Sequence, residues 1–189
     1  NGFTLSETLT NIIIVSALSL SMMFVFVQLK KNFDIEENRT NAINYANRVL
    51  DELATELSIA EEANISANNE LINLSYPSSD NQKTYKISKE LGILKVMNGS
   101  DVPIDESYIP YDKNDRLKYQ ISKLTLSDSV GIDDELVGLN VTSSELKDVL
   151  NSSYNIKMEI KIFDTDSRII EVLKFNRRVF SPSKLFYNS

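Results

Sequence analysis

The chain has 189 residues, 42% of them hydrophobic and 25% charged, with a net charge of -7 at pH 7. This length fits one domain with an appendage, and the composition is that of an ordered protein. The sequence contains no histidine and no cysteine, which excludes disulfides, cysteine nucleophiles, Cys/His zinc sites and the commonest general base. The acidic balance argues against a nucleic-acid backbone as the main partner.

The first feature along the chain is an apolar segment from Leu9 to Leu29 that contains no charged residue. A helix that spans a bilayer needs about 20 mostly apolar residues. Ser16 and Ser19 interrupt the segment only with small hydroxyl side chains, which bond back to helix carbonyls or let neighbouring helices approach closely. A secretory signal peptide is the competing interpretation, but its apolar core has about 7–15 residues and ends at a small-residue cleavage site. The segment therefore predicts a helix compatible with a membrane.

The charged sequence that follows is expected to continue the same helix. No glycine or proline occurs between Phe3 and Tyr76, so nothing in this part of the sequence interrupts the backbone. An apolar stripe at helical spacing runs along the polar part through Ala42, Ala46, Val49, Leu53, Leu57 and Ala60. The pattern predicts one helix of roughly 60 residues, apolar all round at first and amphipathic afterwards.

Beyond Asn64 the sequence changes to short alternating runs separated by turn residues. The clearest predicted strand is Asn155 to Phe163, in which apolar and charged residues alternate. Other strands are expected over residues 72–76, 85–87, 93–97, 118–126 and 169–175, with hairpins joining 85–87 to 93–97 and 155–163 to 169–175. The remaining expected features are a turn at 77–80, a long surface loop over 98–115 and a short helix from the capping box at Thr142–Glu145 to Leu150.

These elements predict an α+β fold. A long N-terminal helix, first a hydrophobic stalk and then amphipathic, is expected to pack on a C-terminal antiparallel β-sheet head. Residues 1–30 would hold a leader remnant and the transmembrane or filament-core helix, and residues 31–189 would form the globular head with the amphipathic half of the helix.

The residues ahead of the apolar segment carry the most specific signal. The segment from Asn1 to Glu7 resembles the type IV pilin and pseudopilin signature, a class III N-methylation motif. In that signature a glycine is followed by Phe-Thr-Leu-x-Glu and a hydrophobic helix, and the matching residues are Gly2, Phe3, Thr4, Leu5 and Glu7. The resemblance implies that prepilin peptidase cleaves between Gly2 and Phe3, which makes Glu7 the fifth residue of the mature chain.

A carboxylate beside an apolar helix needs a partner, because a charge at mid-bilayer costs about 2.5–3.5 kcal/mol. The resemblance implies that the partner is the free N-terminus of a neighbouring subunit, and Glu7 is therefore the expected assembly residue. The alternative is a local one, in which Glu7 stabilises the first turn of its own helix through the helix dipole.

The resemblance further implies a non-enzymatic structural subunit of a type IV pilus or pseudopilus, of the minor-pilin kind. Its expected partners are other pilin subunits, prepilin peptidase, the assembly platform of the pilus or secretion system, and the cytoplasmic membrane, with the head outside the cytoplasm. The chain departs from many family members because it lacks a C-terminal cysteine pair and any Gly or Pro in the stalk. Lys30 and Lys31, taken alone, would place the head in the cytoplasm. A single-span membrane protein whose head binds a ligand or partner is the alternative.

Other candidate sites carry weaker signals. Six glycosylation sequons begin at Asn38, Asn64, Asn73, Asn98, Asn140 and Asn151, as expected by chance in a chain rich in Asn and Ser. Asp112, Asn114 and Asp115 have calcium-like spacing without the glycine and closing acid of a calcium loop. Arg177 and Arg178 suit a small anion or DNA contact, or the protection of an edge strand. We expect no catalytic residues, no metal site and no cofactor.

Overall fold

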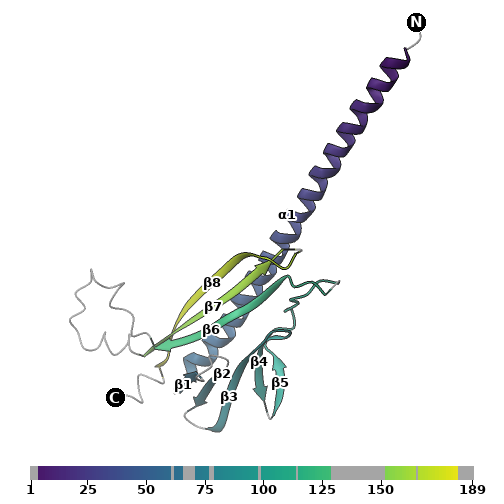
Figure 1. Cartoon of the computed structure of the whole chain (residues 1–189). Coiled ribbons are helices and arrows are strands. Elements are labelled where there is room, and N and C mark those ends of the chain that lie inside the picture. Colours follow the sequence, from purple (N-terminus) through teal and green to yellow (C-terminus); the bar gives the residue numbers. More distant parts are fainter. Residues whose placement is uncertain are drawn as a thin grey trace, which may run out of the picture. The chain divides into compact units, whose positions relative to one another are not determined.

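The computed structural model describes residues 4–60, 62–65, 71–76, 79–97, 99–113, 115–128, 152–164 and 166–182. The chain divides into two compact units, Asn1–Asn38 and Arg39–Ser189. A single helix provides the described part of the first unit, whereas the second unit combines the rest of that helix with antiparallel strands (Figure 1). The predicted α+β class is confirmed. The unit boundary follows Asn38, later than the expected division after residue 30, and buried core residues begin at Ala42.

Helix α1 runs from Leu5 to Ile59 as one element of 55 residues. The uninterrupted helix is confirmed, at nearly the predicted length. All six residues of the predicted apolar stripe, from Ala42 to Ala60, are at most 1% exposed. The stripe is therefore the face that α1 contributes to the core of the head.

The first sheet contains β1 (Glu62–Ile65), β2 (Leu71–Tyr76), β3 (Ser79–Ser88), β4 (Gly92–Met97) and β5 (Ser100–Pro103). Its strands pair in chain order, and each pair is antiparallel. The predicted hairpin is present as β3 and β4. Strand β1 was not predicted, because its four residues are too few to show an alternating pattern.

The second sheet contains β6 (Tyr119–Asp128), β7 (Ser153–Phe163) and β8 (Ile169–Phe180), with β7 in the centre (Figure 1). The alternation predicted for β7 is confirmed, since its buried side chains include Ile156, Met158, Ile160 and Ile162. Strand β8 continues five residues beyond the predicted end at Phe175, because Phe180 still pairs with Ser153. The described part of the head thus contains two antiparallel sheets, a division that the sequence did not predict.

Two predicted irregular regions were partly wrong. Ser79 and Asp80, expected in a turn, belong to β3, and Ser79 pairs with Tyr76. The expected surface loop over 98–115 contains strand β5, which pairs with β4. It also contains Tyr108, which is only 6% exposed. In both regions, pairing with a neighbouring strand gives the segment its β structure. The helix predicted from Thr142 to Leu150 lies outside the described residues.

The core of the head is a single cluster of residues from α1 and both sheets. Three buried tyrosines lie at its centre: the ring centroids of Tyr45 and Tyr108 are 4.7 Å apart, and those of Tyr108 and Tyr119 are 5.5 Å apart. Their hydroxyl oxygens accept hydrogen bonds from three backbone N–H groups, those of Ile93, Ile121 and Ile109 respectively. Because these donors lie in both sheets and the segment between them, the tyrosines hold α1, β4 and β6 together.

Candidate functional site

The first turn of α1 holds the expected assembly residue, Glu7, in a reciprocal contact with Thr4. Glu7 Oε2 accepts hydrogen bonds from the backbone nitrogen of Thr4 at 2.8 Å and from its hydroxyl at 3.0 Å. In return, the Thr4 hydroxyl oxygen accepts a longer bond of 3.4 Å from the Glu7 nitrogen. This arrangement is a capping box, which satisfies free N–H groups at the start of a helix. The expected processing residues, Gly2 and Phe3, lie outside the described residues.

The Thr4 contacts use only one oxygen of the Glu7 carboxylate. Both bonds end on Oε2, and no described residue donates a hydrogen bond to Oε1. The residue is exposed. The geometry therefore serves the local capping role and leaves one carboxylate oxygen available to a donor from another molecule.

The apolar segment from Leu9 to Leu29 exposes its large hydrophobic side chains on every face of the helix. Each of them is at least 45% exposed. An 18-residue window of α1 has a mean hydropathy of 2.4, and none of it is buried within the protein. By length and composition, α1 is one helix able to cross a membrane. Its apolar surface is compatible with membrane anchoring.

Hydroxyl side chains in this part of α1 are satisfied by the helix itself. Ser16 donates a hydrogen bond of 2.7 Å to the Ile12 carbonyl, and Ser19 one of 2.8 Å to the Val15 carbonyl. Thr10 and Ser21 form the same kind of bond four residues back. The predicted bonding of Ser16 and Ser19 to helix carbonyls is confirmed. These hydroxyls therefore need no water, which suits an apolar surrounding.

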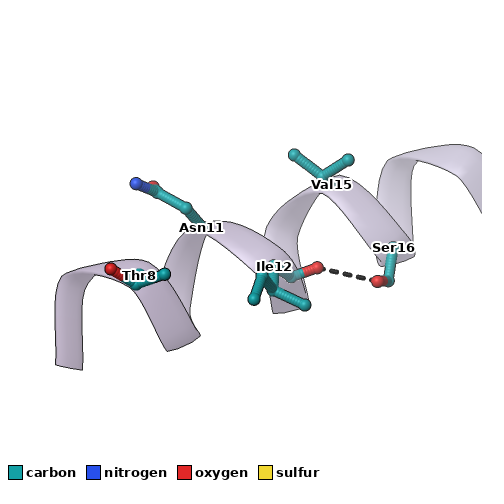
Figure 2. Close-up of a pocket in the computed structure, with 5 residues that line it drawn as sticks. All are labelled: Thr8, Asn11, Ile12, Val15 and Ser16. Atoms are coloured by element: carbon teal, nitrogen blue, oxygen red, sulfur yellow. Dashed lines mark hydrogen bonds between the residues drawn. The ribbon is translucent and has the colours of Figure 1, made fainter. Parts of the chain in front are cut away.

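Two shallow grooves follow one side of the helix. Figure 2 shows the first, with the Ser16 hydroxyl directed to the Ile12 carbonyl; it is lined by Thr8, Asn11, Ile12, Val15 and Ser16. The second is lined by Ser19, Met22, Met23, Phe26, Val27 and Lys30. Steps of three and four residues connect both sets, so they lie on one helix face. Small and polar residues in the first groove let another helix approach closely.

The head contains a charge cluster that the sequence did not predict. Glu56 on α1 is 8% exposed and accepts hydrogen bonds from Lys83 on β3, Lys95 on β4 and Tyr76 on β2. The shortest Lys83 contact is 2.6 Å, and the Lys95 contact is 3.1 Å. Although burial raises the pKa of Glu56, the bonds from Lys83, Tyr76 and Lys95 outweigh it and lower the pKa to about 2. The signal in the sequence that could have revealed this cluster was the position of Glu56 beside Leu57, on the buried face of the helix.

The weaker candidate sites find local partners. Arg177 forms an ion pair with Asp51 on α1, and the next residue, Arg178, is exposed. Asp112 accepts hydrogen bonds from the backbone and guanidinium nitrogens of Arg116, each at 2.9 Å. Asn114, the middle residue of the calcium-like spacing, lies outside the described residues. Within the described part of the chain, no group of three or more potential metal-ligating side chains is present.

The sequons are only partly described. Asn38, Asn64 and Asn73 lie in the described part of the chain, and the remaining three, at Asn98, Asn140 and Asn151, lie outside it. The side chain of Asn73 accepts a hydrogen bond from the Thr84 hydroxyl at 2.9 Å. The side-chain carbonyl of Asn73 is therefore already paired inside the first sheet.

Comparison with known proteins found no match to a protein-family model, to a curated protein or to a solved structure.

Proposed function

We propose that this chain is a structural, non-enzymatic subunit of a type IV pilus or pseudopilus, of the minor-pilin kind. The proposal rests chiefly on one combination: the Gly2–Glu7 motif directly precedes an exposed apolar segment, and the helix that contains this segment continues into the core of the head. A filament subunit needs an apolar helix for its neighbours and a folded head attached to it.

In this proposal the chain is inserted in the cytoplasmic membrane with its head outside the cytoplasm. Prepilin peptidase cleaves between Gly2 and Phe3, and an assembly platform then extracts the subunit into a surface pilus or a pseudopilus. The new N-terminal amine of Phe3 pairs with Glu7 of a neighbouring subunit. The uncommitted Oε1 of Glu7 supports this step, because it can accept a hydrogen bond without breaking the Thr4 cap.

Mass spectrometry of the mature protein from its native host tests the processing step. We expect a chain that begins at Phe3 and carries a methylated amine. A mature protein that retains Gly2 and its leader would contradict the proposal.

Two substitutions of Glu7 separate its assembly role from its capping role. Glu7→Gln keeps a side-chain acceptor at the third helical position and so preserves the capping box, but it removes the charge. Glu7→Ala removes both. We expect both variants to abolish incorporation into filaments, measured by shearing and immunoblotting, with normal membrane levels of the unassembled protein. Normal incorporation of Glu7→Gln would mean that the charge is not needed.

A single-span membrane protein with a ligand- or partner-binding head outside the cytoplasm is the second candidate. The observation in its favour is that the contacts of Glu7 with Thr4 already give this carboxylate a local role as a helix cap. This candidate predicts an unprocessed chain that stays in the membrane when the pilus or secretion genes of its host are expressed. Processing at Gly2 separates the two functions.

A further inference from the structure

The second sheet has a basic surface on the side away from the core. Successive side chains of a strand point to opposite faces, and Ile156, Met158 and Ile160 of β7 are buried. The residues between them therefore face solvent, together with their ladder partners from Gln120 to Ser127 on β6 and from Val172 to Arg178 on β8. This surface, the basic face, carries five cations and one acid: Lys123, Lys157, Lys161, Lys174, Arg178 and Glu159.

The acids at the margin leave this face basic. Glu171 pairs across the ladder with a buried residue of β7, so it lies on the opposite side of the sheet, where it forms an ion pair with Arg39 at 3.5 Å. Asp164 and Asp166, which follow β7, share their turn with Arg168. With this turn included, six cations still stand against three acids. The basic face is a local exception in a chain with a net charge of -7.

Lys157 lies at the centre of the basic face. It is exposed, and its two ladder partners are uncharged. Lys123, Lys174 and Arg178 each lie two residues from one of those partners, in the diagonal position about 7–8 Å away. Glu159 lies directly between Lys123 and Lys174 and offsets part of their charge. The remaining repulsion among the cations would be relieved by carboxylates of another molecule.

The four lysines of the basic face form no ion pair with any described residue. The lysines on strands of the first sheet differ in this respect. Lys83 and Lys95 pair with Glu56, and Lys86 pairs with Asp101. The ammonium groups of the basic face are therefore available to an acidic partner.

The side chains of the basic face favour an acidic protein surface as that partner. Apart from Val172, its uncharged residues are polar: Gln120, Thr125, Ser127, Asn155 and Asn176. These strand positions thus offer little apolar area to acyl chains and no aromatic ring on which a base could stack. A long polyanion would also extend over the acidic remainder of the chain, which repels it.

A second copy of this chain supplies the required carboxylates. Of its 27 acidic residues, only Glu159 lies on the basic face, whereas five of its 20 basic residues do. Two basic faces repel each other, so the face of one copy must meet a different surface of the next. Such a heterologous contact repeats from copy to copy and produces a ring or an open filament.

We infer that the basic face binds an acidic surface of a second copy of this chain, and that this contact joins neighbouring heads in the filament. The inference rests on the proposed function, because the contact is placed in that filament. It adds a charged contact between heads to the assembly through the apolar helix.

Charge reversal in the full chain, expressed in its native host, tests the contact. Lys157→Glu with Lys174→Glu reverses the charge at the centre of the face. Lys89→Glu with Lys113→Glu is the matched control, because it changes the net charge equally at two exposed lysines outside the face. We expect several-fold less of the reversed variant in the sheared filament fraction, normal incorporation of the control and equal membrane levels of both.

A zero-length carbodiimide cross-linker, which couples lysine amines to carboxylates, identifies the partner. In sheared filaments of the parent chain it should produce covalent dimers and longer ladders, with Lys157 or Lys174 in the linked peptides. Lys157→Arg with Lys174→Arg retains the charge but removes the amines. Filaments of this variant should persist, and their ladders should weaken several-fold.

Normal incorporation of the reversed variant, or an equal loss in the control, would overturn the inference and leave the proposed function intact. Cross-links confined to single chains, or to a different protein, would do the same. A parent chain that is neither processed at Gly2 nor found in filaments would overturn both.

Discussion

The hydroxyl oxygen of Tyr45 on α1 lies 2.7 Å from the backbone nitrogen of Ile93 and accepts its hydrogen bond. Tyr45 is 1% exposed, so this bond forms in the core between the helix and the first sheet. The preceding residue, Gly92, has a positive φ of 78° and opens β4. One tyrosine thus positions the helix against the turn at which the β3–β4 hairpin reverses.

Gly92→Ala should destabilise the head strongly. A Cβ at this position would overlap the Tyr45 hydroxyl and lie 2.9 Å from Cγ of Tyr108. The positive φ adds its own cost, and we expect a total loss of at least about 2 kcal/mol in unfolding free energy. This loss is measured by urea unfolding of the full chain in detergent, with tyrosine near-ultraviolet circular dichroism as the probe. Gly99→Ala is the control: its φ is 80°, but no described atom beyond Gly99 and its chain neighbours lies within 4 Å of the added Cβ, so only about 1 kcal/mol should be lost. Equal losses would contradict the steric argument.

Tyr45→Phe should leave the Ile93 N–H buried without its acceptor and cost about 1–3 kcal/mol of unfolding free energy. Tyr111→Phe, at a position 36% exposed, should change it by less than about 0.5 kcal/mol. The same urea assay compares the two. The double variant with Tyr45→Phe and Gly92→Ala should lose less unfolding free energy than the sum of the two single losses, because Tyr45→Phe removes the hydroxyl that clashes with the added Cβ. Strict additivity would argue against direct contact.

Glu56 should make the stability of the head depend on acid pH. Its pKa is lowered to about 2 in the folded chain, against about 4.3 for an unfolded glutamate. A lowered folded pKa stabilises the folded chain at pH values above the unfolded pKa, and this contribution is lost as the pH falls from about 4 to 2. The difference between the folded and unfolded pKa values corresponds to about 3 kcal/mol of unfolding free energy.

Urea titrations between pH 7 and pH 2 on Glu56→Gln test this dependence. The variant should be less stable than the parent chain at pH 7, and the difference should shrink as the pH approaches 2. Glu52→Gln is the control, because Glu52 is 3.6 Å from Lys95 and its side chain is 43% exposed, so its loss should be below about 1 kcal/mol. A difference for Glu56→Gln that stays constant with pH would disprove the assignment.

The ion pair between Arg177 and Asp51 should contribute little to stability. The two side chains are 40% and 64% exposed, and exposed pairs contribute about 0.2–1 kcal/mol. A double-mutant cycle with Asp51→Asn and Arg177→Gln should therefore give a coupling in that range, which falls with added salt. A coupling above 1 kcal/mol, or one insensitive to salt, would show that the pair is more shielded than its exposure indicates.

The periodic spacing of apolar residues predicted the helix and strand that bury one face along their whole length. The stripe from Ala42 to Ala60 and the alternation in Ile156–Ile162 each repeat one buried face, so the sequence carries the signal several times. Strand β5 and Tyr108 lacked such a repeat, because four residues and a single side chain show no period. Glu56 was missed for another reason: its lysine partners are 27 and 39 residues away, and only strand pairing brings them to it.

Some features of the candidate site could likewise be predicted from the sequence, and others could not. The motif up to Glu7 and the apolar segment are contiguous, so the sequence alone predicted the helix start, the membrane-compatible helix and the candidate assembly residue. The bond pattern of Glu7 with Thr4 is visible only in the three-dimensional structure, since the choice between local and intermolecular partners depends on which carboxylate oxygen is already used.

The hydrophobic helix at the N-terminus was determined by the sequence itself, because an apolar run without Gly or Pro satisfies its backbone locally and needs no distant residue. The sequence likewise determined which face of the later helix is buried. The tertiary structure alone decided that the strands form two sheets and that three buried tyrosines accept hydrogen bonds from the backbone N–H groups of Ile93, Ile109 and Ile121. Each of these depends on contacts between residues far apart in the chain, and a local pattern carries no information about which distant partner a strand or a hydroxyl will meet.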